Sequence, residues 1–106
     1  MAFFELEQIE RKALFPNSEV RFIHTENMTI AYWDVLEGAV IPDHKHPHEQ
    51  FTNVLEGEME VTIDGETQVI GPGQVAFYPA NAPHSAIAKV KSRVMDVFSP
   101  ARDDYK

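Results

Sequence analysis

Residues Gly38 to Gln50 read GAVIPDHKHPHEQ, and this stretch decides both the fold and the site. Side chains two residues apart in an extended chain point to the same face, so His44 and His46 are expected to direct their imidazoles the same way. Gln50 lies at an even offset and can rejoin that face. Glu49 is a rival donor, but its odd offset is expected to turn it to the opposite face. The stretch therefore predicts three side chains that converge on one point.

A second stretch, residues 73–84, supplies a fourth side chain and reads GQVAFYPANAPH. Its prolines and asparagine indicate a turn that delivers the final histidine to the start of a new strand. We expect a metal cage split between two neighbouring strands. Its four ligands are His44, His46, Gln50 and His84. His48 shares the parity of the first pair, but the intervening proline restrains the backbone, so it is expected on the surface or beside the ligands.

The composition limits which metal such a cage can hold. The chain contains no cysteine, so thiolate ligands and disulfides are excluded and only nitrogen and oxygen donors remain. Three imidazoles and one amide are neutral, so a divalent ion would keep its full charge and would favour an anionic ligand. We expect one divalent metal ion, and zinc, nickel, iron and manganese remain open.

The rest of the chain has the pattern of an all-β protein. Segments rich in β-branched and aromatic residues alternate with turns, and Asp64-Gly65 is a strong hairpin signal. Short strands with regular turns suggest a closed barrel or a sandwich. Residues Leu6–Leu14 are ambiguous, because their apolar spacing is loosely helical but the following proline stops any helix, so they could equally form an edge strand. The expected strands are 20–24, 28–36, 51–55, 58–63, 68–70, 74–78, about 85–91 and 93–98.

Length and charge restrict the architecture and the partners. The 106 residues suffice for one domain and show no repeat or linker, so residues 1–106 are expected to fold together. A net charge of −8 with dispersed basic residues argues against nucleic acid and anionic membranes as partners. The chain shows no basic, apolar leader and no stretch that approaches a membrane span, so a soluble cytoplasmic protein is expected. Barrels of this size often pair their sheet edges, so we expect a homodimer.

The two stretches resemble the two motifs of the cupin superfamily. In the first motif, residues 38–57 match the spacing of glycine, His-x-His, glutamate and glycine, with Gln50 in place of the glutamate. In the second motif, residues 73–84 match, with Asn81 replacing a glycine where asparagine tolerates a left-handed backbone. The closing asparagine of that motif is Ala88 here. The resemblance implies a single-domain cupin jelly-roll β-barrel.

The last expected strand carries a carboxylate at an unusual place. Asp96 and Phe98 lie two residues apart and share a face. If that face is the barrel interior, the carboxylate is partly desolvated and is a candidate general acid/base. Arg102 is placed to fold back over the barrel mouth, where its planar fork could hold a carboxylate. In an arbitrary protein, an Asp96–Arg102 pair or a solvated tail would be the simpler interpretation.

Residues 96–105 read DVFSPARDDY and look like the tail of the pectin-degradation cupin family KdgF, which also carries the pattern His-x-His-Pro-His-Glu-Gln. The resemblance implies conversion of 4,5-unsaturated monouronates from pectin and alginate breakdown into linear keto sugars. It also implies that Asp96 and Arg102 are catalytic, that Phe98 and Arg102 bind a small anionic sugar, and that the cage holds the metal. A metal-dependent cupin oxygenase and a noncatalytic sugar-binding cupin are the alternatives.

Overall fold

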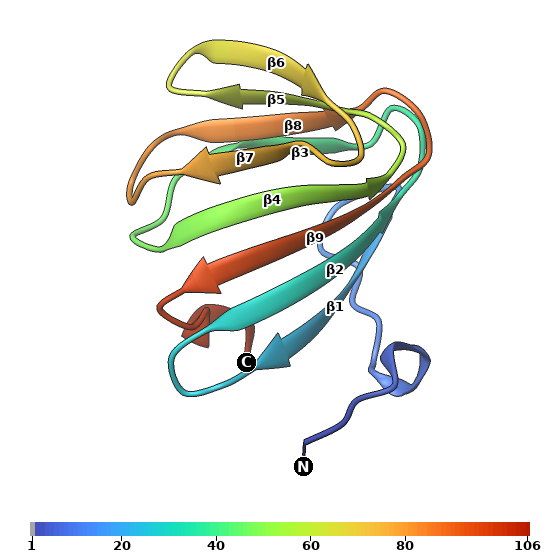
Figure 1. The fold of residues 1–106 in the computed structure, drawn as a ribbon, viewed down its shortest axis with the longest axis vertical. Helices are drawn as coiled ribbons and strands as arrows, with labels where there is room; N and C mark the ends of the chain where they lie inside the picture. Colours follow the sequence, from blue (N-terminus) through green and yellow to red (C-terminus); the bar gives the residue numbers. More distant parts are fainter. Residues whose placement is uncertain (1) are drawn as a thin grey trace.

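The computed structural model describes residues 2–106, which form two antiparallel sheets (Figure 1). One sheet has the strand order β1-β2-β9-β4-β7, and the other has the order β3-β8-β5-β6. The strands are β1 (Ser18–His24), β2 (Thr29–Val35), β3 (Val40–His44), β4 (Glu49–Glu56), β5 (Met59–Ile63), β6 (Glu66–Ile70), β7 (Val75–Tyr78), β8 (His84–Ala88) and β9 (Ser92–Ser99). The expected all-β architecture is confirmed. Met1, the first residue of the expected domain, lies outside the described residues.

Every second side chain of three central strands faces the barrel interior. These side chains divide the interior into a polar and an apolar part. β2, β9 and β4 lie side by side, and their buried residues form cross-strand rows. The row nearest the start of β4 is Thr29, Phe98 and Gln50, the next is Ala31, Asp96 and Thr52, and the third is Trp33, Val94 and Val54. Four of the six side chains in the first two rows are polar, whereas all three side chains of the third row are apolar or aromatic. This division places polar chemistry at one end of the barrel.

The turns explain several residues of the motifs. Asp64 and Gly65 have φ angles of 48° and 80°, which is the left-handed pair expected of a tight hairpin between β5 and β6. Asn81 has a φ of 65°, so it takes the left-handed backbone expected at that position. Gly57 has a φ of 93°, and a Cβ there would lie 2.6 Å from the carbonyl oxygen of Lys91. Only glycine fits this close approach.

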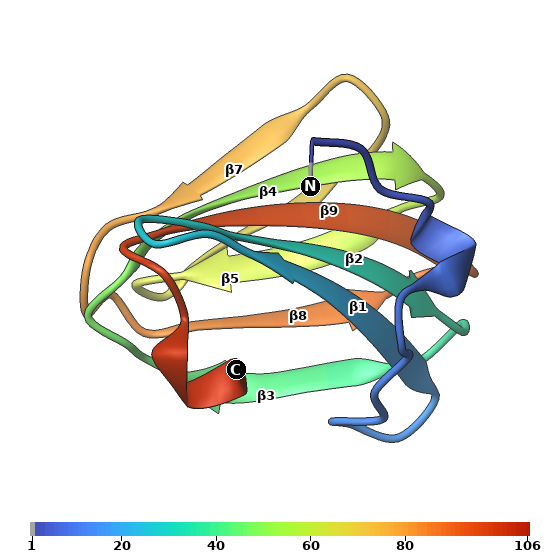
Figure 2. The same ribbon diagram turned by 90° about the horizontal axis from the view of Figure 1, so that it is seen from below.

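A short 3-10 helix lies near each end of the described part of the chain. Residues Leu6–Gln8 form a short 3-10 helix, η1, and Lys12 then makes an isolated bridge to Val20 of β1. The ambiguous segment therefore contains one helical turn and one edge contact. After β9 the chain turns back into a second 3-10 helix, η2 (Asp103–Tyr105), as Figure 2 shows. Within residues 2–106, no helix has the length and apolar character needed to cross a membrane.

Candidate metal centre and its cavity

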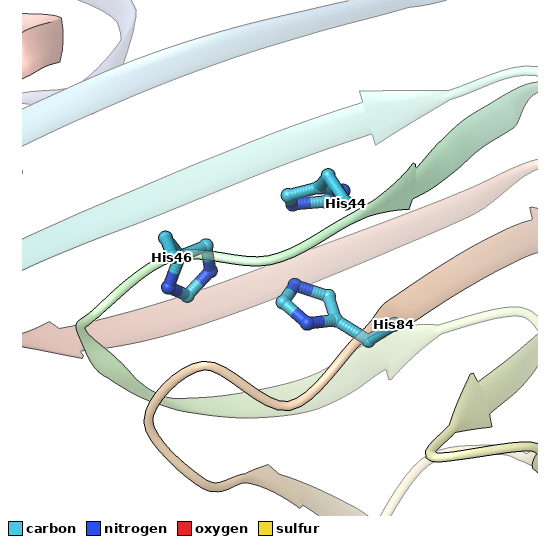
Figure 3. A group of neighbouring side chains, drawn as sticks. All are labelled: His44, His46 and His84. Atoms are coloured by element: carbon cyan, nitrogen blue, oxygen red, sulfur yellow. The ribbon is translucent and has the colours of Figure 1, made fainter.

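Three imidazoles converge at one end of the barrel (Figure 3). His44 ends β3 and His84 begins β8, and these two residues are cross-strand partners in the four-stranded sheet. His46 lies in the loop between β3 and β4. Each ring offers one nitrogen, and these nitrogens all lie within 4.8 Å of one another. The structure thus brings together the three histidines that the sequence singles out.

The expectation of a cage split between two neighbouring strands holds for His44 and His84, which lie on the paired strands β3 and β8, but it was wrong for His46 and Gln50. Gln50 belongs to β4 in the five-stranded sheet, whereas His44 and His84 belong to the other sheet. β3 ends at His44 after an irregularity in its pairing with β8, so His46 lies outside any strand and the two-residue period does not direct it. Convergence depends instead on the β3–β4 loop, which carries the chain from one sheet to the other.

Two neighbours of the cage lie where the sequence predicts. Glu49 is exposed on the face opposite to Gln50. His48 lies beside His46, with ring centroids 5.4 Å apart. It contributes its backbone carbonyl oxygen, which accepts a hydrogen bond from the His46 ring. His48 therefore supports a cage residue from outside the cage.

Backbone carbonyl groups fix the orientation of all three rings. Each Nδ1 lies 2.7 to 3.0 Å from a carbonyl oxygen two residues away. The pairs are His44 with Pro42, His46 with His48, and His84 with Ala82. A carbonyl oxygen can only accept, so each Nδ1 carries the ring proton and each Nε2 keeps a lone pair. Histidines that bind metals are typically held in this way.

The Nε2 atoms and the Gln50 side chain leave a gap in hydrogen bonding that a cation would fill. The buried Nε2 of His84 has no hydrogen-bond partner among the described residues. Nε2 of His46 lies 3.1 Å from Oε1 of Gln50, although in this arrangement both atoms are acceptors. Two ligands about 2.1 Å from a metal and at right angles are about 3.0 Å apart. The donor set therefore fits a divalent ion held by nitrogen and oxygen.

The buried histidines are uncharged at neutral pH. Burial, together with the charge of Arg102, lowers the pKa of His46 to about 4. Burial likewise lowers the pKa of His84. Metal ions bind the neutral form of imidazole, so neither residue has to lose a proton before it can act as a ligand at pH 7.

A chain of hydrogen bonds links the cage to Asp96. Nε2 of Gln50 donates to Oγ1 of Thr52 (3.3 Å), and Oγ1 of Thr52 donates to Oδ1 of Asp96 (2.7 Å). Because the hydroxyl gives its single proton to Asp96, it accepts from the amide, and Oε1 of Gln50 is left to face His46. Burial raises the pKa of Asp96 to about 6, although the Thr52 and Gln50 donors lower it. Asp96 is therefore a buried carboxyl that exchanges a proton near neutral pH.

Arg102 folds back over the barrel mouth, and 5% of it is exposed. Its guanidinium carbon lies 4.9 Å from the ring centroid of Phe98 and 4.2 Å from that of Tyr105. Nε and Nη2 donate to Asp104 at 3.1 and 2.9 Å, and this pairing lowers the pKa of Asp104. Arg102 thus pairs with Asp104 and not with Asp96. One fork of the guanidinium is occupied, and the Nη1–Nη2 end remains available to a carboxylate.

One cavity, with an empty volume of about 620 Å³ that opens to solvent, joins these groups. Its polar lining includes Asp96, Arg102 and three cage residues, and its deeper wall is apolar. The cage residues and the other polar residues of the lining include His44, Gln50, His84, Thr52, Ser85, Asp96 and Arg102. Phe98 lines the cavity between the cage and the apolar wall, with its ring centroid 5.7 Å from that of His46.

Sequence reasoning missed four side chains of the site. Thr52 and Trp33 line the cavity, and both could have been found from the two-residue alternation along β4 and β2. Tyr78 is buried and stacks on His84, with ring centroids 4.3 Å apart and an angle of 19° between the planes. Asp104 holds Arg102, and no pattern in the tail distinguishes it from its neighbouring aspartates.

The fold and the site together define the class of protein. The model of the cupin domain matches residues 31–98, and the chain belongs to the cupin family. This result confirms the expected cupin fold.

Within this family, the chain is similar to proteins named KdgF. It is 34% identical over 71 residues to the pectin degradation protein KdgF of Dickeya dadantii, a match that covers 65% of this chain and 64% of that relative, which is less than two thirds of its length. The structure of KdgF from Halomonas sp. has a TM-score of 0.93 at 30% identity and covers 100% of this chain and 99% of the other. An RmlC-like cupin from Shewanella frigidimarina has a TM-score of 0.94 at 28% identity, covering 100% and 96% of the two chains.

Proposed function

We propose that this chain is a metal-dependent enzyme that converts 4,5-unsaturated monouronates, released by breakdown of pectin or alginate, into linear keto sugars. One observation carries the proposal: a single cavity holds a neutral cage, a buried carboxyl with a pKa of about 6, and an arginine with one open fork. The likeness to proteins named KdgF, one of them a pectin degradation protein, supports the same function.

The substrate is a cyclic enol ether that carries a carboxylate on C5. Linearisation places a proton on C4 and a water oxygen on C5, which gives a hemiketal. The bond between C5 and the ring oxygen then breaks, the ring oxygen takes a proton, and the aldehyde hydrate at C1 loses water. One water is added and one is lost, so the net reaction is an isomerisation. The enzyme therefore needs a group that binds the carboxylate and a group that moves protons.

Asp96 would move the protons. Its Oδ1 accepts from Thr52 at 2.7 Å. Oδ2, the other oxygen of the carboxyl, would hold the transferred proton. With a pKa of about 6, the carboxyl can give a proton to C4 and take one back from a hydroxyl near neutral pH.

The remaining groups bind and orient the substrate. The open Nη1–Nη2 end of Arg102 would pair with the substrate carboxylate, and Phe98 would form the apolar wall beside the sugar ring. The divalent ion would be held by His44, His46, Gln50 and His84. When bound, it supplies positive charge that attracts and polarises an oxygen of the anionic ligand.

The test is the loss of the ultraviolet chromophore of the C4=C5 double bond, measured against the spontaneous rate. Metal-loaded protein is compared with chelated protein and with Asp96→Asn, whose metal content is measured in parallel. We expect Asp96→Asn to keep its metal and to lose about 100-fold or more of the rate, which is typical of a missing acid/base group. Asp103→Asn is the matched control, because Asp103 is an exposed carboxylate of the same tail and should leave the rate unchanged.

A rate equal to the spontaneous one would overturn the proposal. Oxygen consumption with a phenolic or thiol substrate would then indicate the oxygenase, and binding of saturated galacturonate without turnover would indicate the sugar-binding cupin. The homodimer and the cytoplasmic location expected from the sequence stay predictions, for measurement by light scattering and by fractionation of cells.

A further inference from the structure

Trp33 lines the cavity from β2, one inward-facing pair away from Asp96 in the five-stranded sheet. Trp33 pairs with Val94 in the β2–β9 ladder, and the next inward-facing pair toward the cage is Ala31 with Asp96. Ala31 is small, so its place in the row leaves room beside the carboxylate. Phe15 stacks on the indole, with ring centroids 6.0 Å apart and 25° between the planes. The indole is thus held by packing at the level below Asp96.

The indole N–H is a buried donor without a partner. Trp33 is 8% exposed and lines the cavity, and its Nε1 makes no hydrogen bond within residues 2–106. Buried donors of native proteins are nearly always paired, so an orphan donor calls for an explanation. Burial raises the pKa of Asp96, and Trp33 is among the facing groups that lower it, which places the N–H toward the carboxylate.

Trp33 and Asp96 therefore present a donor and an acceptor to the same space. Oδ1 of Asp96 is held by Thr52 at 2.7 Å, and Oδ2 is the second acceptor of the carboxyl. An indole N–H is a donor only, and an ionised carboxylate oxygen is an acceptor only. A hydrogen bond to a charged acceptor is stronger than one between neutral groups, so a small rotation that pairs these two atoms is favourable.

We propose that Trp33 is a positioning residue for Asp96: its indole N–H holds the second carboxylate oxygen, as Thr52 holds the first, and so directs that oxygen's remaining lone pair toward the ligand. The kinetic part of this inference rests on the proposed function, whereas the contact itself does not. A carboxylate held at both oxygens cannot rotate about its Cβ–Cγ bond, so its proton is delivered along one fixed direction.

The experiment uses the fact that Trp33 is the single tryptophan of the chain. Growth with the sulfur isostere β-(benzothienyl)alanine replaces only this residue and removes the N–H while it keeps the shape and the stacking on Phe15. Trp33→Phe is a second variant that also lacks the donor. Tyr32→Phe is the matched control, because Tyr32 lies next to Trp33 in β2 but outside the residues that line the cavity.

In kinetics with metal-loaded protein, we expect the isostere and Trp33→Phe to lower kcat about 10-fold, in line with loss of one hydrogen bond to a charged group. KM and the affinity for saturated galacturonate, measured by calorimetry, should stay within about 2-fold, because the substrate is bound by other groups. Tyr32→Phe should match the parent. The assignment of Trp33 as a positioning residue is overturned if the isostere-containing protein keeps the parent kcat. It is also overturned if kcat and the affinity for saturated galacturonate fall together.

A second arm does not depend on activity. The chain has one tryptophan, so its spectrum contains one indole N–H resonance. We expect Asp96→Asn to move this resonance toward that of an unbonded indole, while Asp103→Asn leaves it in place. If the parent does not consume the uronate but the resonance moves, the proposed function fails and the Trp33–Asp96 contact stands. If the indole N–H resonance does not move in Asp96→Asn, the proposed contact between Trp33 and Asp96 is overturned.

Discussion

Replacing Asp96 with asparagine should stabilise the metal-free protein at alkaline pH while it removes the activity. Burial raises the pKa of Asp96 from an ordinary 3.8 to about 6. The difference is about 2 pKa units, and each unit corresponds to about 1.4 kcal/mol, so the ionised carboxylate lowers the free energy of unfolding by about 3 kcal/mol. Asparagine carries no charge, and its Oδ1 can still accept the hydrogen bond that Thr52 donates to Asp96.

The sign of the pH dependence follows from the direction of the shift. Because the folded state binds this proton more tightly than the unfolded chain, the free energy of unfolding falls as pH rises from about 4 to about 6. The loss of unfolding free energy caused by the ionised Asp96 is complete above about pH 7 and absent below about pH 3. Asp96→Asn should therefore gain up to about 3 kcal/mol at pH 8 and up to about 1 kcal/mol at pH 4.5.

Urea denaturation in the presence of a chelator measures this difference. The parent, Asp96→Asn and the exposed control Asp103→Asn are unfolded at both pH values, and the control should stay within about 0.5 kcal/mol of the parent. The reasoning is refuted if Asp96→Asn is no more stable than the parent at pH 8. It is also refuted if the gain is equal at pH 8 and pH 4.5, because the charge would then not be its cause.

Three further substitutions test other parts of the structure. Gln50→Glu adds a negative charge to neutral ligands, so divalent metal should bind at least about 10-fold more tightly in competition with a chelator. Arg102→Lys loses the planar fork, so KM should rise about 10-fold or more with a smaller change in kcat, as steady-state kinetics would show. Gly57→Ala would bring a Cβ to 2.6 Å from the Lys91 carbonyl oxygen at a φ of 93°, so urea denaturation should show a loss of about 2 to 4 kcal/mol.

Most of the fold could be predicted because its signals are local. Alternation in Met59–Ile63 followed by Asp64-Gly65 defines a hairpin without reference to the rest of the chain, and the structure has that hairpin. Strand ends were less certain, because they depend on pairing with distant partners. The expected strand 85–91 is His84–Ala88, since β8 pairs with its neighbours only as far as Ala88 and the chain then turns into β9.

The interior position of Asp96 could be predicted for the same reason. β9 is regular and is paired on both sides near this residue, so the two-residue period holds there. The route by which the cage assembles could not be predicted, because His46 lies in a loop whose path depends on where β3 stops pairing with β8. The sequence also did not show which aspartate pairs with Arg102, because three aspartates lie within reach of it along an irregular tail.

The charges around the cavity explain why a cage of neutral ligands would suit an anionic ligand. Asp104 neutralises Arg102, so the side chains alone give the cavity no surplus of positive charge, within a chain of net charge −8. An anionic ligand would therefore depend on the metal for its attraction. A divalent ion on neutral ligands keeps two positive charges, whereas a glutamate in place of Gln50 would leave one. The amide of Gln50 adds no negative charge to the cavity, whereas Asp96, with a pKa of about 6, is mostly ionised at pH 7, so the full charge of a divalent ion would have to offset this carboxylate as well as attract the ligand.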